Sequence, residues 1–380
     1  MSTFRIQTAL VQEYNSTIQQ KTFRSEPTPD SRIFGLDLLR ACAILLVVFV
    51  HTSFLLPESF PNLSWLPDGV DLFFVLSGFL VGGILIRKIR SEEGLTWKSL
   101  TVFLKRRWFR TLPNYFLFLF IYLLLVYFGF LQGTLNKYVL AYFVFLQNMF
   151  VPVDFVFWES WSLSVEEWFY LSFPLLFYIS LRLFRSKLRD TLLALILLYI
   201  LVPLLYRIQI SAKPVDLERW DLWFRKLVAT RLDSIGFGLL GAFIYSYSAE
   251  TWKKFRNLTM VLGFAGLSAI SMMTILPDTF FFKTFYFSLT AFFIALLLPK
   301  LNSMVRETIP GKPFRFLSRI SYSMYLCNLP ILLLVKHFFH PEGGFEKTTL
   351  FFVCWVLIIL ASLLIYKLFE YPITKLRDRL

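Results

Sequence analysis

The chain has 380 residues, of which 57% are apolar and only 17% are charged, against about 25% charged in a soluble domain. Runs such as 116–127 and 351–365 are apolar on nearly every side and leave no water-facing stripe. This composition excludes a secreted or cytosolic protein and a membrane barrel. In a membrane protein, the net charge of +14 is explained first by basic residues in cytoplasmic loops, and nucleic-acid binding is the less direct explanation.

The predicted fold class is all-α, a polytopic integral membrane protein with about ten transmembrane helices. Residues 1–31 form a polar tail without the apolar core of a signal peptide, and we expect this tail in the cytoplasm. Residues 138–152 are apolar but short, and they predict a re-entrant or interfacial helix. The ten predicted spans are 41–57, 70–86, 112–131, 161–181, 191–207, 228–247, 258–276, 284–299, 320–338 and 349–369.

Orientation follows from the basic residues, because they collect in cytoplasmic loops. If the amino terminus is inside, most of the 39 Lys and Arg residues fall in inner segments, which predicts that both termini are cytoplasmic. The outer loop 208–226 is an exception with four basic residues, and it is a candidate surface for an acidic ligand. We expect no extracytoplasmic domain appended to the membrane domain, 32–378.

His51 is the strongest candidate for chemistry, because a titratable group at bilayer depth is costly and is by default functional. It follows Arg40 by eleven residues, which on a helix is almost three full turns and about 16 Å. Arg40 and His51 therefore share one face, with Arg40 at the cytoplasmic surface and His51 about halfway across. The alternative is a core histidine satisfied by a neighbouring carbonyl.

Two further segments carry polar groups toward this region. Asp71 and Ser77 lie on the second predicted span, where Asp71 is also compatible with an exposed helix start and Ser77 with a close helix contact at Ser77-Gly78. Arg107 and Arg110 precede Pro113, a residue that favours helix starts. Arginine forks suit phosphates, although plain cytoplasmic anchoring explains these arginines equally well.

Acidic residues mark the outer ends of two later spans. Glu166 and Glu167 are adjacent in an apolar helix that opens at Trp161, and at most one of them can face a given partner because neighbours point about 100° apart. Pairing with Arg231 or another cation would lower the cost of burying either carboxylate. Asp233 accompanies Arg231.

The last two spans add a polar stripe and a terminal carboxylate. Ser321, Tyr325 and Asn328 recur at helical spacing, and Glu370 closes the final helix at the inner surface. His337 and His340 are spaced as a metal pair, but no compact cluster of further ligands accompanies them, so no metal site is predicted.

Together these residues resemble the membrane acyltransferase 3 family, bacterial enzymes that modify cell-surface and secreted glycans. The resemblance covers about 32–378, and its specificity lies in the order of several motifs. In chain order these are Arg40-x10-His51, Gly69-Val70-Asp71-Leu72-Phe73-Phe74-Val75-Leu76-Ser77-Gly78, Arg107-x-x-Arg110, Trp161-Ser162-Leu163-Ser164-Val165-Glu166-Glu167-x-Phe169-Tyr170, Arg231-Leu232-Asp233 and Glu370-x-Pro372.

One position departs from the family. Asn328 stands where the family commonly has histidine, and asparagine hydrogen-bonds but carries no proton at neutral pH. An acid–base role at this position is therefore not carried over.

The resemblance implies an O-acyltransferase of the bacterial inner membrane that moves an acyl group, most simply acetyl, from cytoplasmic acyl-CoA to a glycan hydroxyl. Acyl-CoA is the donor substrate and no cofactor is permanently bound; the partners are membrane lipid, acyl-CoA and the glycan, without nucleic acid. Arg40, Arg107 and Arg110 are assigned to acyl-CoA and His51 to the general base, with Glu166 or Asp71 orienting it. Residues assigned to the acceptor or pocket are Ser77, Trp161, Arg231, Asp233, Tyr325, Asn328 and Glu370.

Alternatives remain at this stage. A covalent acyl-enzyme on Ser77 or His51 competes with direct transfer. The second function class is a secondary transporter, in which intramembrane charges form a substrate or proton path, although the two related halves common in transporters are not evident. The glycan, the acyl group and the oligomeric state are left open.

Overall fold

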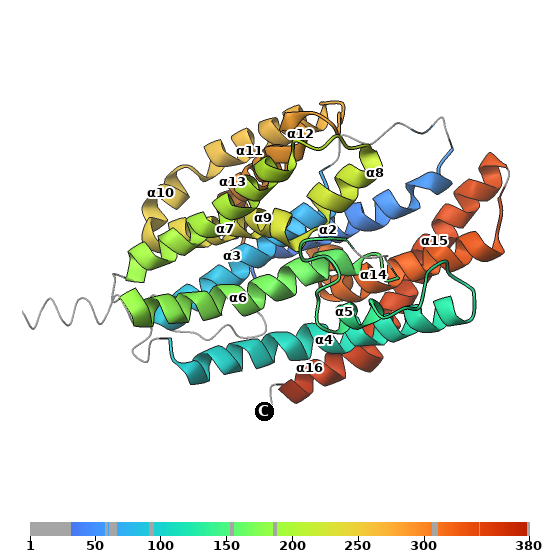
Figure 1. Ribbon diagram of the computed structural model, residues 1–380, viewed down its shortest axis with the longest axis horizontal. Helices are drawn as coiled ribbons and strands as arrows, with labels where there is room; N and C mark the ends of the chain where they lie inside the picture. The colour runs from blue at the N-terminus through green and yellow to red at the C-terminus, as the bar shows by residue number, and fades with distance from the viewer. Residues whose placement is uncertain are drawn as a thin grey trace, which may run out of the picture. The chain divides into compact units, whose positions relative to one another are not determined.

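The structure is a computed structural model that describes residues 32–57, 60, 67–90, 95–152, 156–184, 188–305, 311–341 and 343–377. One compact unit spans Phe34–Leu380, and the predicted tail 1–31 lies outside the described residues. Every regular element in the described part of the chain is helical, which confirms the all-α prediction (Figure 1).

Each of the ten predicted spans corresponds to one long helix. Eight helices of the described residues are long and apolar enough to cross a membrane; the other two long helices are α6, with its glutamates, and α11, of 16 residues. The long helices are α2 (Phe34–Thr52), α3 (Gly69–Arg90), α4 (Trp97–Tyr127), α6 (Ser160–Phe184), α7 (Leu188–Ile210), α9 (Val228–Tyr247), α11 (Arg256–Ser271), α13 (Tyr286–Ser303), α14 (Gly311–Phe338) and α15 (Gly344–Ile365).

Shorter helices connect and extend the long ones. They are η1 (Ser53–Leu55), α5 (Val139–Phe143), α8 (Leu217–Trp220), α10 (Ala249–Lys254), α12 (Phe280–Thr284) and α16 (Tyr371–Arg377), together with π-helical segments at Asp221–Arg225 and Tyr366–Glu370.

The segment 138–152 does not cross the bundle. It contains only the five residues of α5 as helix. The helices on either side of it, α4 and α6, run in opposite directions: Thr111 Oγ1 donates to Glu167 Oε1 at 2.6 Å, while Tyr122 OH, further along α4, donates to Glu159 Oε2, just before α6, at 2.7 Å. A crossing between them would have made the two helices parallel, so the prediction of a short non-spanning helix is confirmed.

The helix of the third predicted span begins earlier than Pro113 suggested. Pro113 lies inside α4, which begins sixteen residues earlier at Trp97. Thr96 and Ser99 form a capping box there, so the first amides of the helix are satisfied upstream of the basic run, and the straight-chain basic residues continue it. Arg107 and Arg110 are therefore residues of α4 itself, and they do not sit in a loop before the helix.

Helices α2 and α14 lie side by side and run in the same direction. Arg40 Nη1 donates to Ser318 Oγ at 3.4 Å, and eleven residues later His51 contacts Asn328 at 2.6 Å. The shared face predicted for Arg40 and His51 is therefore confirmed, and it is the face packed against α14.

Helices α3 and α9 cross with their backbones in close contact. A Cβ built on Gly78 would overlap the backbone oxygen of Ile235, and a Cβ built on Gly238 would overlap that of Val75. Only glycine permits such an approach. The close helix contact considered for Ser77-Gly78 is thus present at Gly78, and it fixes α3, whose side chains line the site described next.

Candidate functional site

Two neighbouring cavities share Val70 and Tyr325 as lining residues. We name them the arginine cavity, of about 100 Å³, and the histidine cavity, of about 280 Å³. The arginine cavity is lined by Arg40, Val70, Phe73, Phe74, Ser77, Leu80, Arg107, Arg110, Thr111, Ser162, Leu163, Glu166, Tyr170, Ser321, Tyr322 and Tyr325. The histidine cavity is lined by Val47, Val50, His51, Asp68, Gly69, Val70, Trp158, Glu159, Trp161, Arg225, Lys226, Tyr325, Leu329 and Leu333.

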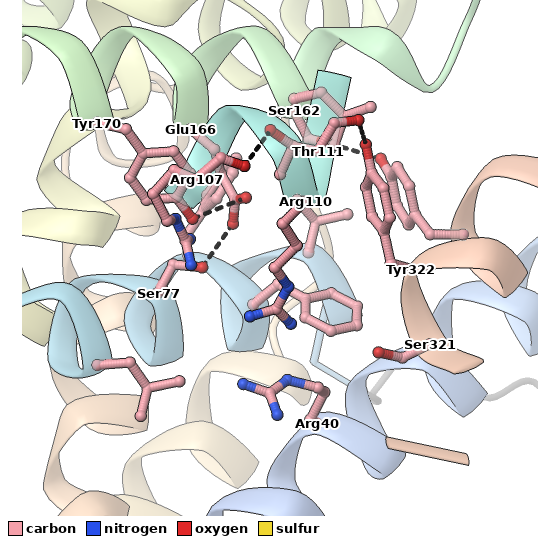
Figure 2. A pocket seen from close by; sticks show the side chains of 16 residues that line it. Arg40, Ser77, Arg107, Arg110, Thr111, Ser162, Glu166, Tyr170, Ser321 and Tyr322 are labelled. Atoms are coloured by element: carbon pink, nitrogen blue, oxygen red, sulfur yellow. Dashed lines mark hydrogen bonds between the residues drawn. The ribbon is translucent and has the colours of Figure 1, made fainter. Parts of the chain in front are cut away.

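The arginine cavity brings together the three arginines that the sequence singled out. Figure 2 shows Arg40 from α2 and Arg107 and Arg110 from α4 around the same space. Asp37 Oδ1 lies 3.5 Å from Arg40 Nη1, and the Arg107 guanidinium lies 3.9 Å from the centre of the Tyr170 ring. The Nε of Arg107 is buried and has no hydrogen-bond partner within the described part of the chain. The cavity can therefore hold an anion with several oxygens.

The two adjacent glutamates of α6 face different neighbours, as their spacing predicted. Glu166 lines the arginine cavity, where its Oε1 accepts from Ser77 Oγ at 2.6 Å and its Oε2 from Tyr170 OH at 3.0 Å (Figure 2). Glu167 accepts from Thr111 on α4 at 2.6 Å. Arg107 interacts electrostatically with both carboxylates, so the cation that offsets their burial is Arg107, whereas Arg231 pairs elsewhere.

His51 lines the histidine cavity and contacts Asn328 on α14. Its Nδ1 lies 2.6 Å from Asn328 Oδ1. Both protons of the Asn328 amide are taken by backbone carbonyls, those of Met324 at 2.9 Å and Tyr325 at 2.6 Å. Asn328 therefore offers His51 only an acceptor, so Nδ1 carries the proton and Nε2 keeps a lone pair. The orienting group beside His51 is thus an amide; the sequence had suggested Glu166 or Asp71.

Asp71, Arg231 and Asp233 form buried ion pairs outside the linings of both cavities. Asp71 Oδ1 pairs with Arg231 Nη2 across the crossing of α3 and α9, and Asp233 Oδ2 lies 2.7 Å from Arg207 Nη2. The side chains of all four are at most 2% exposed. The pairs hold α3, α7 and α9 together, and the catalytic role predicted for Asp71 gains no support from its position.

Replacing Asp71 by alanine is expected to lower the free energy of unfolding by about 3–5 kcal/mol, because the Arg231 charge stays buried without its partner. Thermal unfolding in detergent measures the effect, and Asp71→Ala combined with Arg231→Met should recover part of the loss. A single variant that unfolds at the wild-type temperature would show that the pair is dispensable for the fold.

The remaining predicted residues divide between the cavities and the packing around them. Trp161 lines the histidine cavity beneath the Arg225 guanidinium, which lies 5.1 Å from its ring centre. Tyr325 lines both cavities, and its OH lies 2.6 Å from Ser162 Oγ. Glu370 is buried outside both linings, where it accepts from Ser323 at 2.6 Å and Asn114 at 3.2 Å. It joins the end of the chain to α4 and α14.

Sequence reasoning did not single out Asp68 and Glu159 of the histidine cavity, and it included Arg225 and Lys226 only as part of the basic loop 208–226. Arg225 and Lys226 end the basic loop singled out above, but the structure pairs them. Arg225 Nη2 lies 2.7 Å from Asp68 Oδ2 and Lys226 Nζ lies 2.5 Å from Asp221 Oδ2. Asp68 and Glu159 each directly precede a helix rather than lying on a predicted apolar face, so periodicity gave no signal for them.

Within these ion pairs, the Asp68 carboxylate stays charged at neutral pH. Burial alone would raise the pKa of Asp68, but the Arg225 guanidinium outweighs it and holds that pKa below its usual value. Burial lowers the pKa of Lys226, and the neighbouring Asp221 carboxylate opposes that shift. A lowered carboxylate pKa means that the pairing of Asp68 is fully present above its unfolded-state pKa and is lost only as pH falls through the folded-state pKa.

Comparisons with known proteins agree with the family resemblance. A family described as an acyltransferase domain matches residues 33–367. O-acetyltransferase OatA of Staphylococcus aureus (strain NCTC 8325 / PS 47) is 26% identical over 364 residues, which are 90% of this chain and 57% of the relative. Peptidoglycan O-acetyltransferase OatA of Listeria monocytogenes serovar 1/2a is 25% identical over 332 residues, 79% of this chain and 49% of the relative. The chain thus spans about half the length of these curated relatives, and no solved structure gives a significant match.

Proposed function

The chain belongs to the acyltransferase domain family that matches residues 33–367, and on that premise we propose that it is an integral membrane O-acyltransferase. The observation that carries the proposal is the arrangement of the two cavities. One cavity collects three arginines, the other holds a histidine with a free lone pair, and the two share Val70 and Tyr325.

The arginine cavity is the proposed site for the phosphates of acyl-CoA. Arginine guanidinium groups form short, paired hydrogen bonds with phosphate oxygens. The unpartnered Nε of buried Arg107 supports an anionic ligand, because a buried donor without an acceptor is costly. With the amino terminus in the cytoplasm, as the basic residues predict, Arg40 at the start of α2 faces the side on which acyl-CoA is made.

In the proposed reaction, His51 Nε2 takes the proton of an acceptor hydroxyl as its oxygen attacks the thioester carbon. A carbon–oxygen bond forms, the carbon–sulfur bond breaks, and CoA leaves as the thiolate, to which the protonated histidine returns its proton. Direct transfer is favoured over an acyl-enzyme on Ser77, since Ser77 lines the arginine cavity and His51 the other one.

The names of the relatives narrow the substrates. Both are O-acetyltransferases and one is a peptidoglycan O-acetyltransferase, so we propose acetyl as the group and a cell-envelope glycan as the acceptor. Both come from bacteria, and we place the chain in the bacterial cell membrane with cytoplasmic termini. Lipopolysaccharide, one of the acceptors compatible with the family resemblance, has no support from these names.

Release of CoA by the purified protein tests the proposal. In lipid nanodiscs with acetyl-CoA, we expect CoA release that a glycan acceptor accelerates. A transporter, the alternative class, would release no CoA and would instead move a labelled solute into proteoliposomes. The absence of CoA release with any acceptor, from folded protein, would reject the acyltransferase proposal.

The arginines are expected to act on donor affinity. Replacing Arg107 or Arg110 by alanine should raise the KM for acetyl-CoA about 10- to 100-fold, because each charged hydrogen bond contributes about 1.5–3 kcal/mol. Arg106→Ala is a matched control, since Arg106 is exposed and lines neither cavity. If all three variants bind acetyl-CoA like the wild type, the cavity arginines serve topology alone.

Asn328 is expected to position His51 rather than to exchange protons. Asn328→Leu should lower kcat about tenfold, the cost of one lost hydrogen bond to the imidazole, with the KM for acetyl-CoA unchanged. It should also alter the pH dependence of kcat, because Nδ1 loses the acceptor that fixes its proton. An unchanged kcat and pH profile would remove Asn328 from this role.

A further inference from the structure

The wall of the histidine cavity includes several polar and aromatic groups that the reaction above does not use. These are Trp158 and Glu159 before α6, Lys226 and Arg225 before α9, and Asp68 before α3. They come from three separate connections between helices. All five line the same cavity as His51, where their side chains can contact a bound ligand.

Glu159 carries the clearest sign of an absent partner. Its side chain is buried, with the residue 3% exposed. One carboxylate oxygen, Oε2, accepts from Tyr122 OH at 2.7 Å, whereas Oε1 has no hydrogen-bond partner among the residues that the structure describes. The backbone oxygen of Glu159 is tied down by Tyr325 OH at 3.0 Å. A buried acceptor held in place without a donor is costly, so a ligand hydroxyl that reached Oε1 would relieve that cost.

The basic side chains of the histidine cavity do not favour an anionic ligand. Arg225 is shared between Asp68, at 2.7 Å, and Asp221, at 2.8 Å, and Lys226 lies 2.5 Å from Asp221. Two cations therefore meet two carboxylates, and burial raises the pKa of Glu159 to about 8, so its side chain adds little charge near neutral pH. Because both cations already lie beside carboxylates, a carboxylate on the ligand would have no unpaired cation among these residues to bind.

Two tryptophans give the same cavity an apolar surface next to these polar groups. Trp158 is 44% exposed although it lines the cavity, and Lys226 Nζ lies 5.5 Å from its ring centre. Trp161 is buried beneath Arg225. The volume of about 280 Å³ equals that of about nine waters at their liquid volume, the scale of a single sugar ring. Aromatic faces beside a few fixed polar groups are typical of sites that orient such a ligand.

We propose that the histidine cavity is a subsite for one uncharged sugar ring, with Glu159 accepting a hydrogen bond from a ring hydroxyl and Trp158 covering an apolar face of the ring. This inference rests on the proposed function, and it specifies the acceptor class. It makes Trp158 and Glu159 binding residues for the sugar whose hydroxyl is presented to His51.

Binding without catalysis tests the subsite directly. The protein is placed in lipid nanodiscs, because alkyl glycoside detergents would compete, and titrated calorimetrically with methyl N-acetylglucosaminide and with methyl glucuronide, which carries a carboxylate. We expect the uncharged sugar to bind at least about tenfold more tightly than the glucuronide. Tighter or equal binding of the glucuronide, or no binding of either sugar, overturns the proposal.

Variants then locate the binding. Glu159→Gln keeps the size of the side chain, and Trp158→Ala changes a half-exposed side chain, so both should fold. Each should weaken binding of methyl N-acetylglucosaminide, and raise the KM for a glycan acceptor, about tenfold. Neither residue lines the arginine cavity, so the KM for acetyl-CoA should not change. Glu250→Gln and Trp97→Ala are matched controls, because both residues are exposed and line neither cavity.

The outcomes separate the two proposals. If the wild type cleaves acetyl-CoA and transfers the acetyl group, but both variants keep wild-type sugar affinity, the subsite is rejected and the acyltransferase stands. If the wild type binds the uncharged sugar through Trp158 and Glu159 but never releases CoA, the subsite stands as a sugar site and the acyltransferase is rejected.

Discussion

His51→Gln is expected to lower the rate of acyl transfer about 100- to 10,000-fold, which is the usual contribution of a general base. Glutamine has a similar length and its side-chain amide can donate to Asn328 Oδ1, so the packing of α2 on α14 should persist. It has no lone-pair nitrogen with a near-neutral pKa to take a proton. The loss should appear in kcat, with the KM for acetyl-CoA little changed, because the arginine cavity is intact.

Steady-state CoA release in nanodiscs measures this effect, and the unfolding temperature confirms that the variant is folded. His337→Gln is the matched control, since His337 is exposed and lines neither cavity. Mass spectrometry of the protein after incubation with acetyl-CoA adds a second readout. Transfer at the wild-type rate by folded His51→Gln, or an acetyl group trapped on Ser77, would contradict the direct mechanism.

Gly78→Ala is expected to cost about 3 kcal/mol or more in unfolding free energy, at the upper end of the cost of overpacking. The added Cβ would overlap the backbone oxygen of Ile235, and a backbone atom cannot move aside as a flexible side chain does. Gly238 stands in the reciprocal position against Val75. Helices α3 and α9 must separate to admit either methyl group.

Gly83→Ala supplies a control on the same helix, because a Cβ there meets no other atom within 4 Å. Thermal unfolding and monodispersity in detergent should distinguish the two alanine variants, with Gly83→Ala close to the wild type. Equal unfolding temperatures would show that the crossing of α3 and α9 tolerates a wider separation. Activity is a further readout, since Ser77 beside Gly78 lines the arginine cavity.

Much of the fold follows from residue patterns along the chain. Apolar runs of sufficient length predicted the helices, and the spacing of Arg40 and His51 predicted their common face. The prediction of a helix start failed where a capping motif, and not the apolar run, sets that start. The helix containing Arg107 begins at the capping box of Thr96 and Ser99, a pattern that carries no hydrophobicity and precedes the apolar run.

The contacts within the site were beyond reach of the sequence. Asn328 lies 277 positions from His51, and Ser77 lies 89 positions from Glu166. Helical periodicity states which face a side chain occupies but not which helix covers that face. Glu159 lies in the connection before α6, outside any helical period, so its place in the lining of the histidine cavity emerged only from the packed chain.

The parallel packing of α2 on α14 also fixes the distance between Arg40 and His51. Arg40 and His51 are separated by eleven residues of one continuous helix, about 16 Å, and each is held to α14 at its own level. If acyl-CoA binds as proposed, with its phosphates at Arg40, it must be long enough to bring its reactive carbon to His51. On that proposal, acetyl phosphate, whose acyl group adjoins the phosphate, would bind at the arginines and not reach the histidine, so we expect the distance between the phosphates and the acyl group to select the donor.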